Sequence, residues 1–200
     1  MILILSVVAH EVAHGFAALK MGDKTAYYAG RLSLNPVRHL DWFGSVIVPL
    51  LLALSPAGFI LGWAKPVPIN PYNFRHRRLG EIFVSAAGPA TNILLAVVFG
   101  LLLRFFVVGG AASAALVGIG STIVVINIVL AVFNLIPVPP LDGSKIVFAT
   151  LPERFSPWFE FGERYGLIMV FVFAIVLWRL VFPVIPFLFE TLTGFPLALR

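Results

Sequence analysis

The sequence predicts an all-α polytopic membrane protein, and three observations carry that prediction. Hydrophobic residues make up 60% of the 200 positions, and charged residues make up 12%, which is about half the share of a typical soluble protein. The mean hydropathy is +1.01. The apolar residues also form long runs, and a bilayer-spanning helix needs about 20 of them in succession. We therefore expect one membrane domain over residues 1–200.

Five apolar runs approach or exceed the length of a membrane-spanning helix: 2–22, 43–63, 80–108, 111–136 and 165–190. The first run lacks the basic N-terminal region of a signal peptide and carries ionisable residues in its middle. We therefore interpret it as a functional helix that is not cleaved. The second run predicts either a kinked span or a re-entrant pair of half-helices, because it contains Pro49, Pro56, Gly58 and Gly62.

Two connections are expected to form short extended, β-like loops. Residues 25–34 combine β-branched and aromatic side chains around Gly30, and an Asn-Pro pair follows. Residues 63–71 contain Pro66, Pro68 and Pro71, which exclude a helix there. These loops could offer an edge to an incoming peptide strand, or they could serve only as connectors that shield a site.

Charge and cysteine content exclude several classes of function. The formal net charge is +5, but the cations are scattered through loops between apolar runs, which favours contact with anionic lipid headgroups and not with nucleic acid. The chain has no cysteine, so disulfides, thiolate metal sites and cysteine nucleophiles are excluded.

The first apolar run contains the motif H-E-x-x-H, formed by His10, Glu11 and His14. The i, i+4 spacing places both imidazoles on one face of a helix, one turn apart, where they can bind one metal ion. Glu11 would project beside them, close enough to act on a metal-activated water without being a ligand. A pattern that fixes three positions also arises by chance, but ionisable groups without a purpose would each cost about 3 kcal/mol at the bilayer centre.

A catalytic zinc ion usually has three protein ligands and one water molecule, so the sequence should supply a third ligand. Asp23 and Asp41 lie beside basic residues in the first connection, and we expect them to be solvated loop carboxylates. His39 and His76 stand among arginines and prolines, and we expect them at the membrane interface.

Asp142 differs from these four residues. It follows a loop with three prolines that ends the fourth apolar run, and Gly143 comes next. Asp142 could cap a helix over residues 143–150, and the capping role is compatible with a ligand role. A single carboxylate on a rigid loop at the end of a membrane run favours the ligand role.

Together, these motifs resemble those of the site-2 protease family of intramembrane zinc metalloproteases. The resemblance rests on H-E-x-x-H in an apolar helix and on the pattern N-x-x-P-x-P-P-L-D-G at residues 134–143. Two further features strengthen it: the Gly-Asp pair at 22–23 with GRLSLNP at 30–36, and AGPATN at 87–92. It extends from residue 10 to about residue 164 and is closest to compact prokaryotic-type members without PDZ or CBS domains.

The resemblance implies an intramembrane zinc metalloendopeptidase with a single domain. Its substrates would be membrane proteins, cut in or near their transmembrane segments, as in regulated intramembrane proteolysis. It implies one zinc ion held by His10, His14 and Asp142, with Glu11 as the catalytic residue. The expected location is the prokaryotic cell membrane, and water would reach the site through a polar cleft.

The resemblance leaves several points open. Asn92 and Asn134 would either support the site or serve as helix caps or interhelical hydrogen-bonding groups. Only nine residues precede His10, whereas many family members have a further helix there, so we expect either a minimal member or an N-terminally shortened form. The substrate, the residues that contact a substrate strand and the oligomeric state are not indicated.

Two other functions are compatible with metal-binding side chains in a membrane. A divalent-metal transporter would carry ionisable groups along several helices, but the runs 43–63, 111–136 and 165–190 have almost none besides Arg179 and Glu190. A non-catalytic scaffold would not need Glu11, because zinc binding requires the histidines and not this carboxylate. The sequence therefore favours a protease.

Overall fold

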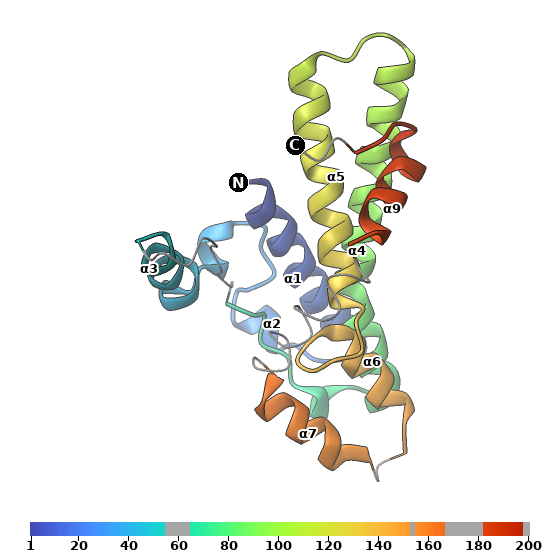
Figure 1. Ribbon diagram of the computed structural model, residues 1–200. Helices are drawn as coiled ribbons and strands as arrows, with labels where there is room; N and C mark the ends of the chain where they lie inside the picture. Colours follow the sequence, from blue (N-terminus) through green and yellow to red (C-terminus); the bar gives the residue numbers. More distant parts are fainter. Residues whose placement is uncertain (55–64, 153–154, 167–181, 198–200) are drawn as a thin grey trace.

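The computed structural model describes residues 1–54, 65–152, 155–166 and 182–197, and every regular element in these ranges is helical (Figure 1). The short elements η1 and η3 are 3-10 helices, and η2 is a π-helical turn. The elements in chain order are α1 (Ile2–Met21), α2 (Thr25–Tyr28), η1 (Pro36–His39), η2 (Trp42–Ile47), α3 (Val48–Leu54), η3 (Pro71–Asn73), α4 (Arg77–Val108), α5 (Ala114–Asn134), α6 (Asp142–Thr150), α7 (Ser156–Arg164) and α9 (Val184–Thr193).

Three of these helices, α1, α4 and α5, are long and apolar enough to cross a membrane. They match the first, third and fourth predicted runs to within three residues at each end. Residues 55–63 of the second run and 167–181 of the fifth lie outside the described residues, so five spans and a re-entrant second segment stay predictions. The described parts of those two runs include α3 and α9.

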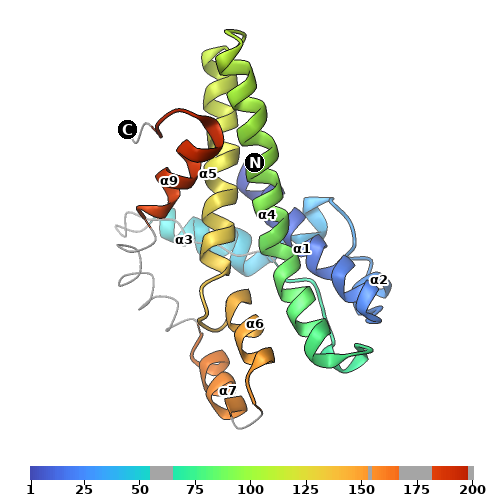
Figure 2. The same cartoon turned by 90° about the vertical axis from the view of Figure 1, so that its right-hand side faces the viewer.

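Helix α4 is the element around which the others are assembled. It contacts α1, α5, α6 and α9, and Figures 1 and 2 show α4 and α5 side by side as an antiparallel pair, with α6 and α7 at the end where α4 begins. Its 32 residues extend about 48 Å at 1.5 Å per residue, whereas the hydrocarbon core of a bilayer is about 30 Å thick. One end of α4 therefore reaches beyond the hydrocarbon.

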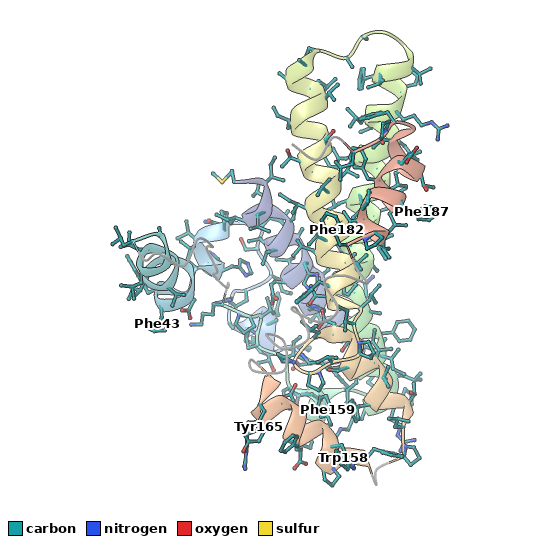
Figure 3. All side chains as sticks on the ribbon, viewed as in Figure 1. Phe43, Trp158, Phe159, Tyr165, Phe182 and Phe187 are labelled. Carbon is teal, nitrogen blue, oxygen red and sulfur yellow. The ribbon has the colours of Figure 1, made fainter. Side chains whose placement is uncertain are left out.

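The apolar core lies where α9 packs against the α4–α5 pair. Its buried members are Ala96, Val124, Ile128, Ile185 and Phe189. The outer surface of the same helices stays apolar, and Figure 3 shows Phe187 on the outer side of α9. Apolar side chains on both the inner and the outer surface are expected for helices that have lipid as their solvent.

The prediction of an extended loop over residues 25–34 is wrong at its start, where Thr25–Tyr28 form the helical turn α2. The cause lies in the residues just before it. Gly22 ends α1 with a φ of 112°, and the carboxylate of Asp23 accepts hydrogen bonds from the backbone N–H and the hydroxyl of Thr25. These local bonds hold the start of α2, and the residues that follow form a helical turn despite their β-propensity.

The second predicted loop agrees with the structure over residues 65–70, which have no regular secondary structure, whereas Pro71 begins η3. No strand occurs in the described ranges, so neither loop is part of a sheet. The loop packs against α1, where a Cβ atom added to Gly15 would lie 3.0 Å from Val67 Cγ1. Glycine at position 15 therefore lets this loop approach the helix that carries the histidines.

Candidate metal centre

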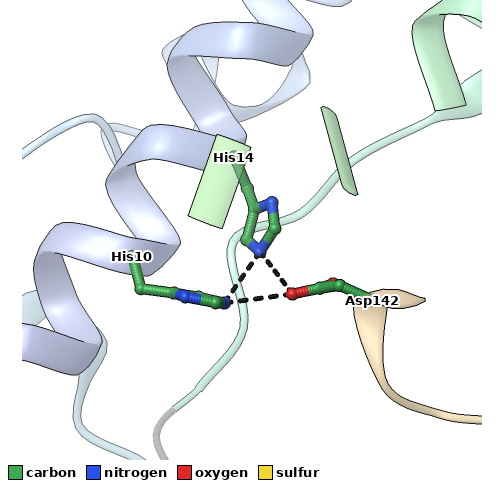
Figure 4. A group of neighbouring side chains, drawn as sticks. All are labelled: His10, His14 and Asp142. Carbon is green, nitrogen blue, oxygen red and sulfur yellow. Dashed lines mark hydrogen bonds and ion pairs between the residues drawn. The ribbon is translucent and has the colours of Figure 1, made fainter. Parts of the chain in front are cut away.

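Three side chains from two distant parts of the chain converge beside α4 (Figure 4). His10 and His14 project from one face of α1, and Asp142 is the first residue of α6. The two Nε2 atoms lie 3.0 Å apart, and each lies 3.1 Å from Asp142 Oδ2. All three residues are buried. The structure thus brings together the three residues that the sequence predicts as metal ligands.

Each imidazole is held in place through its other ring nitrogen. His14 Nδ1 donates to the backbone carbonyl of Val84 at 2.6 Å, because a carbonyl oxygen can only accept a hydrogen bond. The Nε2 atom of neutral His14 therefore carries a lone pair directed toward the cluster. His10 Nδ1 lies 2.6 Å from Asn92 Oδ1. Hydrogen bonds of this kind orient the histidine ligands of metal sites.

The loop that ends in Asp142 is packed tightly on both sides. A Cβ atom on Gly143 would collide with the backbone carbonyl of Leu135, so the loop closes back on the end of α5. Across the loop, a Cβ atom on Gly162 of α7 would lie 2.6 Å from Pro139 Cγ. Asp142 lies within α6 and not before it, since the N-cap is Leu141, so the alternative role as a helix cap is not observed.

Gly88 of α4 forms the wall next to the two histidines. A Cβ atom at this position would collide with the Nε2 atoms of both His10 and His14. Pro89 follows, and it cannot donate the N–H that would bond to the Ser85 carbonyl, so the hydrogen-bond ladder of α4 is interrupted beside the cluster. Only a residue without a side chain leaves room for an ion at this wall.

The three ligand atoms fit a zinc ion. Tetrahedral zinc with bonds of about 2.0–2.2 Å holds its ligand atoms about 3.3–3.6 Å apart. The separations here are 3.0–3.1 Å, so each ligand atom has to move outward by only a few tenths of an ångström to hold the ion. Two imidazole nitrogens and one carboxylate oxygen are also the donor types that zinc prefers. Among the residues that the structure describes, these three form the group capable of holding a metal ion.

Glu11 lies next to this group but is not part of it. Its Oε2 atom accepts a hydrogen bond of 2.8 Å from the backbone N–H of Val67. The backbone around Val67 is itself anchored by the buried Arg31, whose Nη2 donates to the carbonyls of Lys65 at 2.7 Å and Pro66 at 3.3 Å. A carboxylate beside a metal site and outside its ligand set is what a general base requires.

A cleft of about 930 Å³ connects the cluster to the surface near the start of α4. His10, Glu11, His14 and Asp142 form its inner wall, and Phe159 of α7 also lines it, whereas Trp158 is exposed (Figure 3). The charged residues along the cleft are Arg77, Arg78, Glu81, Lys145 and Glu163. Polar walls of this kind allow water to reach a site that is buried among helices.

Asp23 does not reach the cluster, and the expectation that it is a solvated carboxylate is wrong. It is fully buried and accepts hydrogen bonds from the Asn70 N–H at 2.7 Å and from Asn73 Nδ2 at 2.8 Å, as well as from Thr25. Burial opposes ionisation, but these hydrogen bonds outweigh it and hold the pKa of the Asp23 carboxyl below its usual range. Asp23 therefore ties the end of α1 to η3.

The other three alternatives also lie outside the cluster. His39 is buried within the protein, and its Nε2 donates to the Ser33 carbonyl at 2.8 Å. Asp41 caps η2 by accepting from the Gly44 N–H. His76 is exposed and precedes α4. None of these three residues belongs to the metal-binding group found among the described residues.

The two predicted supporting residues differ in what they contact. Asn92 is fully buried and contacts His10, as described above. Asn134 lines the cleft, but its Nδ2 donates to the Leu130 carbonyl of its own helix at 2.9 Å. Sequence reasoning missed Asn127 and Ser6, and it noted Gly88 only as part of the AGPATN motif, without a role in the site. Ser6 could have been found from its spacing, since it lies one turn before His10 on the same helix face.

Apolar helices around a buried His-His-Asp group, with a glutamate beside that group, define a helical membrane protein with the side chains of a metallohydrolase. Sequence comparison gives the family. The model of "Peptidase family M50" matches residues 107–177. Over 175 residues the chain is 41% identical to a protein of Bacillus subtilis (strain 168), covering 85% of this chain and 76% of that one. The chain belongs to peptidase family M50, the site-2 protease family. It is an integral membrane protein, and the family supports a role as a metalloprotease.

Two further relatives are consistent with this family assignment. A protein of Mycolicibacterium smegmatis is 30% identical over 86% of this chain and 64% of its own length. A protein of Methanocaldococcus jannaschii is 30% identical over 69% of this chain and 62% of its own length. The three relatives are named "Putative zinc metalloprotease" YwhC, Rip2 and MJ0611, in the order given. The chain spans less than two thirds of the last two, and no solved structure matches it.

Proposed function

We propose that this chain is an intramembrane zinc metalloendopeptidase that cleaves peptide bonds in or near the transmembrane segments of other membrane proteins. The observation that carries the proposal is the convergence of His10 Nε2, His14 Nε2 and Asp142 Oδ2 within 3.1 Å of one another. Family membership and three candidate membrane spans support it. In this proposal residues 1–200 form one catalytic domain in a prokaryotic cell membrane.

Each residue has a defined role in the proposed reaction. His10, His14 and Asp142 would hold one zinc ion. When bound, zinc supplies a Lewis acid that polarises the substrate carbonyl and makes water acidic near neutral pH. Glu11 accepts the proton of the attacking water and delivers it to the nitrogen of the leaving amine. The Val67 N–H fixes Glu11 Oε2, so the orientation of this carboxylate is set before a substrate enters.

The loop at 65–67 is assigned to orienting Glu11 and not to pairing with a substrate strand. Its Lys65 N–H donates to the His39 carbonyl, and Arg31 occupies the carbonyls of Lys65 and Pro66. With the Val67 N–H bound to Glu11, four backbone groups in three residues already have partners. A strand added by β-pairing would have to displace these bonds.

The substitution Glu11→Gln tests the proposal. The variant keeps the size of the side chain but cannot accept a proton as a base, so we expect a loss of proteolysis of about 10²–10⁴-fold. Zinc content should be unchanged, because Glu11 is outside the ligand group. The measurements are metal analysis of the detergent-purified protein and cleavage of single-span membrane proteins in proteoliposomes.

Glu190→Gln provides the matched control, since Glu190 is exposed on α9 and lies outside the cleft. It should keep both zinc and activity. Unchanged cleavage by the Glu11 variant would contradict the assignment of this residue. Wild-type protein without zinc, or without cleavage but with zinc transport across the vesicle membrane, would overturn the protease function itself.

A further inference from the structure

A chain of buried polar side chains runs from α1 through α5 and α4 back to His10. Asn127 Nδ2 donates to Ser6 Oγ at 3.0 Å, and Asn92 Nδ2 donates to Asn127 Oδ1 at 2.8 Å. Asn92 Oδ1 then lies 2.6 Å from His10 Nδ1. Asn92 and Asn127 are 0% exposed and Ser6 is 5% exposed. Polar groups placed this deep among apolar helices are costly unless each has a partner.

One backbone carbonyl determines the direction of every hydrogen bond in this chain. Asn127 also lies 2.9 Å from the carbonyl oxygen of Ile123, in the preceding turn of α5. A carbonyl oxygen can only accept, so the amide group of Asn127 that faces it must be the NH₂ group. The carbonyl end of Asn127 must then face Asn92. Because that end also accepts only, Asn92 must turn its own NH₂ group toward Asn127.

The same reasoning continues to the metal ligand. With its NH₂ group directed at Asn127, Asn92 presents its carbonyl oxygen to His10. His10 Nδ1 must therefore carry the proton and donate it. In a neutral imidazole with a proton on Nδ1, Nε2 carries the lone pair, and Nε2 is the atom that faces His14 and Asp142.

We propose that Asn127 is a positioning residue that acts through Asn92 to fix His10 in the Nδ1–H tautomer. The inference rests on the proposed function in that it takes Nε2 of His10 as a zinc ligand. The Val84 carbonyl fixes His14 in the same tautomer through one hydrogen bond. The Ile123 carbonyl fixes His10 through a series of three hydrogen bonds. Both imidazoles then present lone pairs to one point.

Helix packing alone does not account for this arrangement. A polar pair that served only to join α4 and α5 would work with either amide orientation. Here the orientation is fixed at one end by Ile123 and is used at the other end by His10. Ser6 adds a contact to α1 but can either donate or accept, so it does not set the direction.

The first test determines the tautomer of His10 in the metal-free protein. Long-range proton–nitrogen NMR of the metal-free protein in detergent distinguishes Nδ1–H from Nε2–H histidine, and it is recorded at about pH 8.5, two units above the pKa of an unperturbed imidazole. Loss of a signal in His10→Gln assigns it. We expect His10 as Nδ1–H in the wild type and a mixture of both tautomers in Asn127→Leu, because Asn92 is then free to reverse.

The second test measures zinc affinity by competition with a chelator. Asn127→Leu should weaken zinc binding about 10–100-fold, as loss of hydrogen bonding behind a metal ligand does elsewhere. Ser6→Ala should change the affinity less than about threefold, since the Ile123 carbonyl still sets the direction. Thr122→Val is the control, because it removes an exposed hydrogen bond to the Gly118 carbonyl on the same helix.

The results of the two tests either support or overturn the proposed role of Asn127. Wild-type affinity and an unchanged His10 tautomer in Asn127→Leu would overturn the inference, as would an Nε2–H tautomer in the wild type. The wild-type tautomer alone decides it if Asn127→Leu does not fold. Wild-type protein that shows the Nδ1–H tautomer but binds no zinc would refute the proposed function and leave the hydrogen-bond direction standing.

Discussion

The first half of α4 faces the histidines of α1 with Gly88 and Asn92, whereas the second half faces α9 and α5 with Gly100 and Leu103. Glycine serves two purposes along this one helix. At position 88 it leaves space beside ligand atoms, and at position 100 it lets the backbone of α4 approach Leu192 of α9. Adding the same methyl group to either position should therefore affect different properties of the protein.

The largest effect is expected from Gly88→Ala. The new methyl group would lie against the Nε2 atoms of both histidines, where the metal ion is proposed to bind. Because zinc contributes several kcal/mol of transition-state stabilisation, we expect zinc loss and a fall in proteolysis of about 10³-fold or more. The helix itself should tolerate alanine, which is a better helix former than glycine. Metal analysis and cleavage assays in detergent provide the measurements.

Gly118→Ala is the control for this substitution. No atom lies within 4 Å of a Cβ atom added at Gly118 on α5, so the variant should keep zinc and activity. A Gly88→Ala variant with its full zinc content would remove the distinction between the two halves of α4.

Asp142→Asn changes the ligand that faces the two histidines from α6. A neutral amide is a much poorer ligand than a carboxylate, but both histidines remain. We expect weaker zinc binding and a loss of proteolysis of about 10²-fold. The fold should survive, because Asp142 is not the cap of α6. Asp41→Asn is the control, since asparagine caps a helix about as well as aspartate. Near-normal cleavage by Asp142→Asn would refute its ligand role.

Gly100→Ala should affect stability and not the metal site. A Cβ atom at this position would lie 2.9 Å from Leu192 Cβ, so α9 would have to move away from α4. Overpacking of this kind typically costs about 1–3 kcal/mol. Thermal unfolding in detergent should show a lower Tm, while zinc content per folded molecule stays unchanged. If zinc were lost together with stability, the two halves of α4 would be coupled.

Features that depend on neighbouring residues could be predicted from the sequence, whereas contacts between distant residues could not. The spans α1, α4 and α5 follow from long apolar runs, and the shared face of His10 and His14 follows from helical spacing alone. Asp142 lies 132 residues from His10, so spacing could not bring them together. The rigid proline loop indicated only that this carboxylate had a fixed position.

Residues whose role depends on the pairing of helices could not be predicted. Asn127 looks like an isolated amide in an apolar run until α5 is placed beside α4 and α1. Asp23 was expected to be solvated because it lies beside basic residues in a connection. Its partners Asn70 and Asn73 lie 47 and 50 residues away, so the local sequence does not reveal them. The helical turn at Thr25, in contrast, is accompanied by hydrogen bonds between residues only two apart, so the local sequence could have indicated it.

The smallest effect is expected at Asp23, which is remote from the metal centre and joins α1 to η3. Its pKa is lowered in the folded protein, because the ionised carboxylate accepts hydrogen bonds from Asn70, Asn73 and Thr25. A lowered pKa means that the stabilisation is complete above the unfolded-state value of about 3.9 and is lost as the pH falls through the folded-state value. Asp23→Asn should therefore lower the Tm at neutral pH, and its difference from the wild type should shrink below about pH 4. Thermal unfolding of both proteins across this range measures the effect, with zinc content at neutral pH as the check that the site is intact. A difference that stays constant with pH would show that the ionised form of Asp23 does not stabilise the fold.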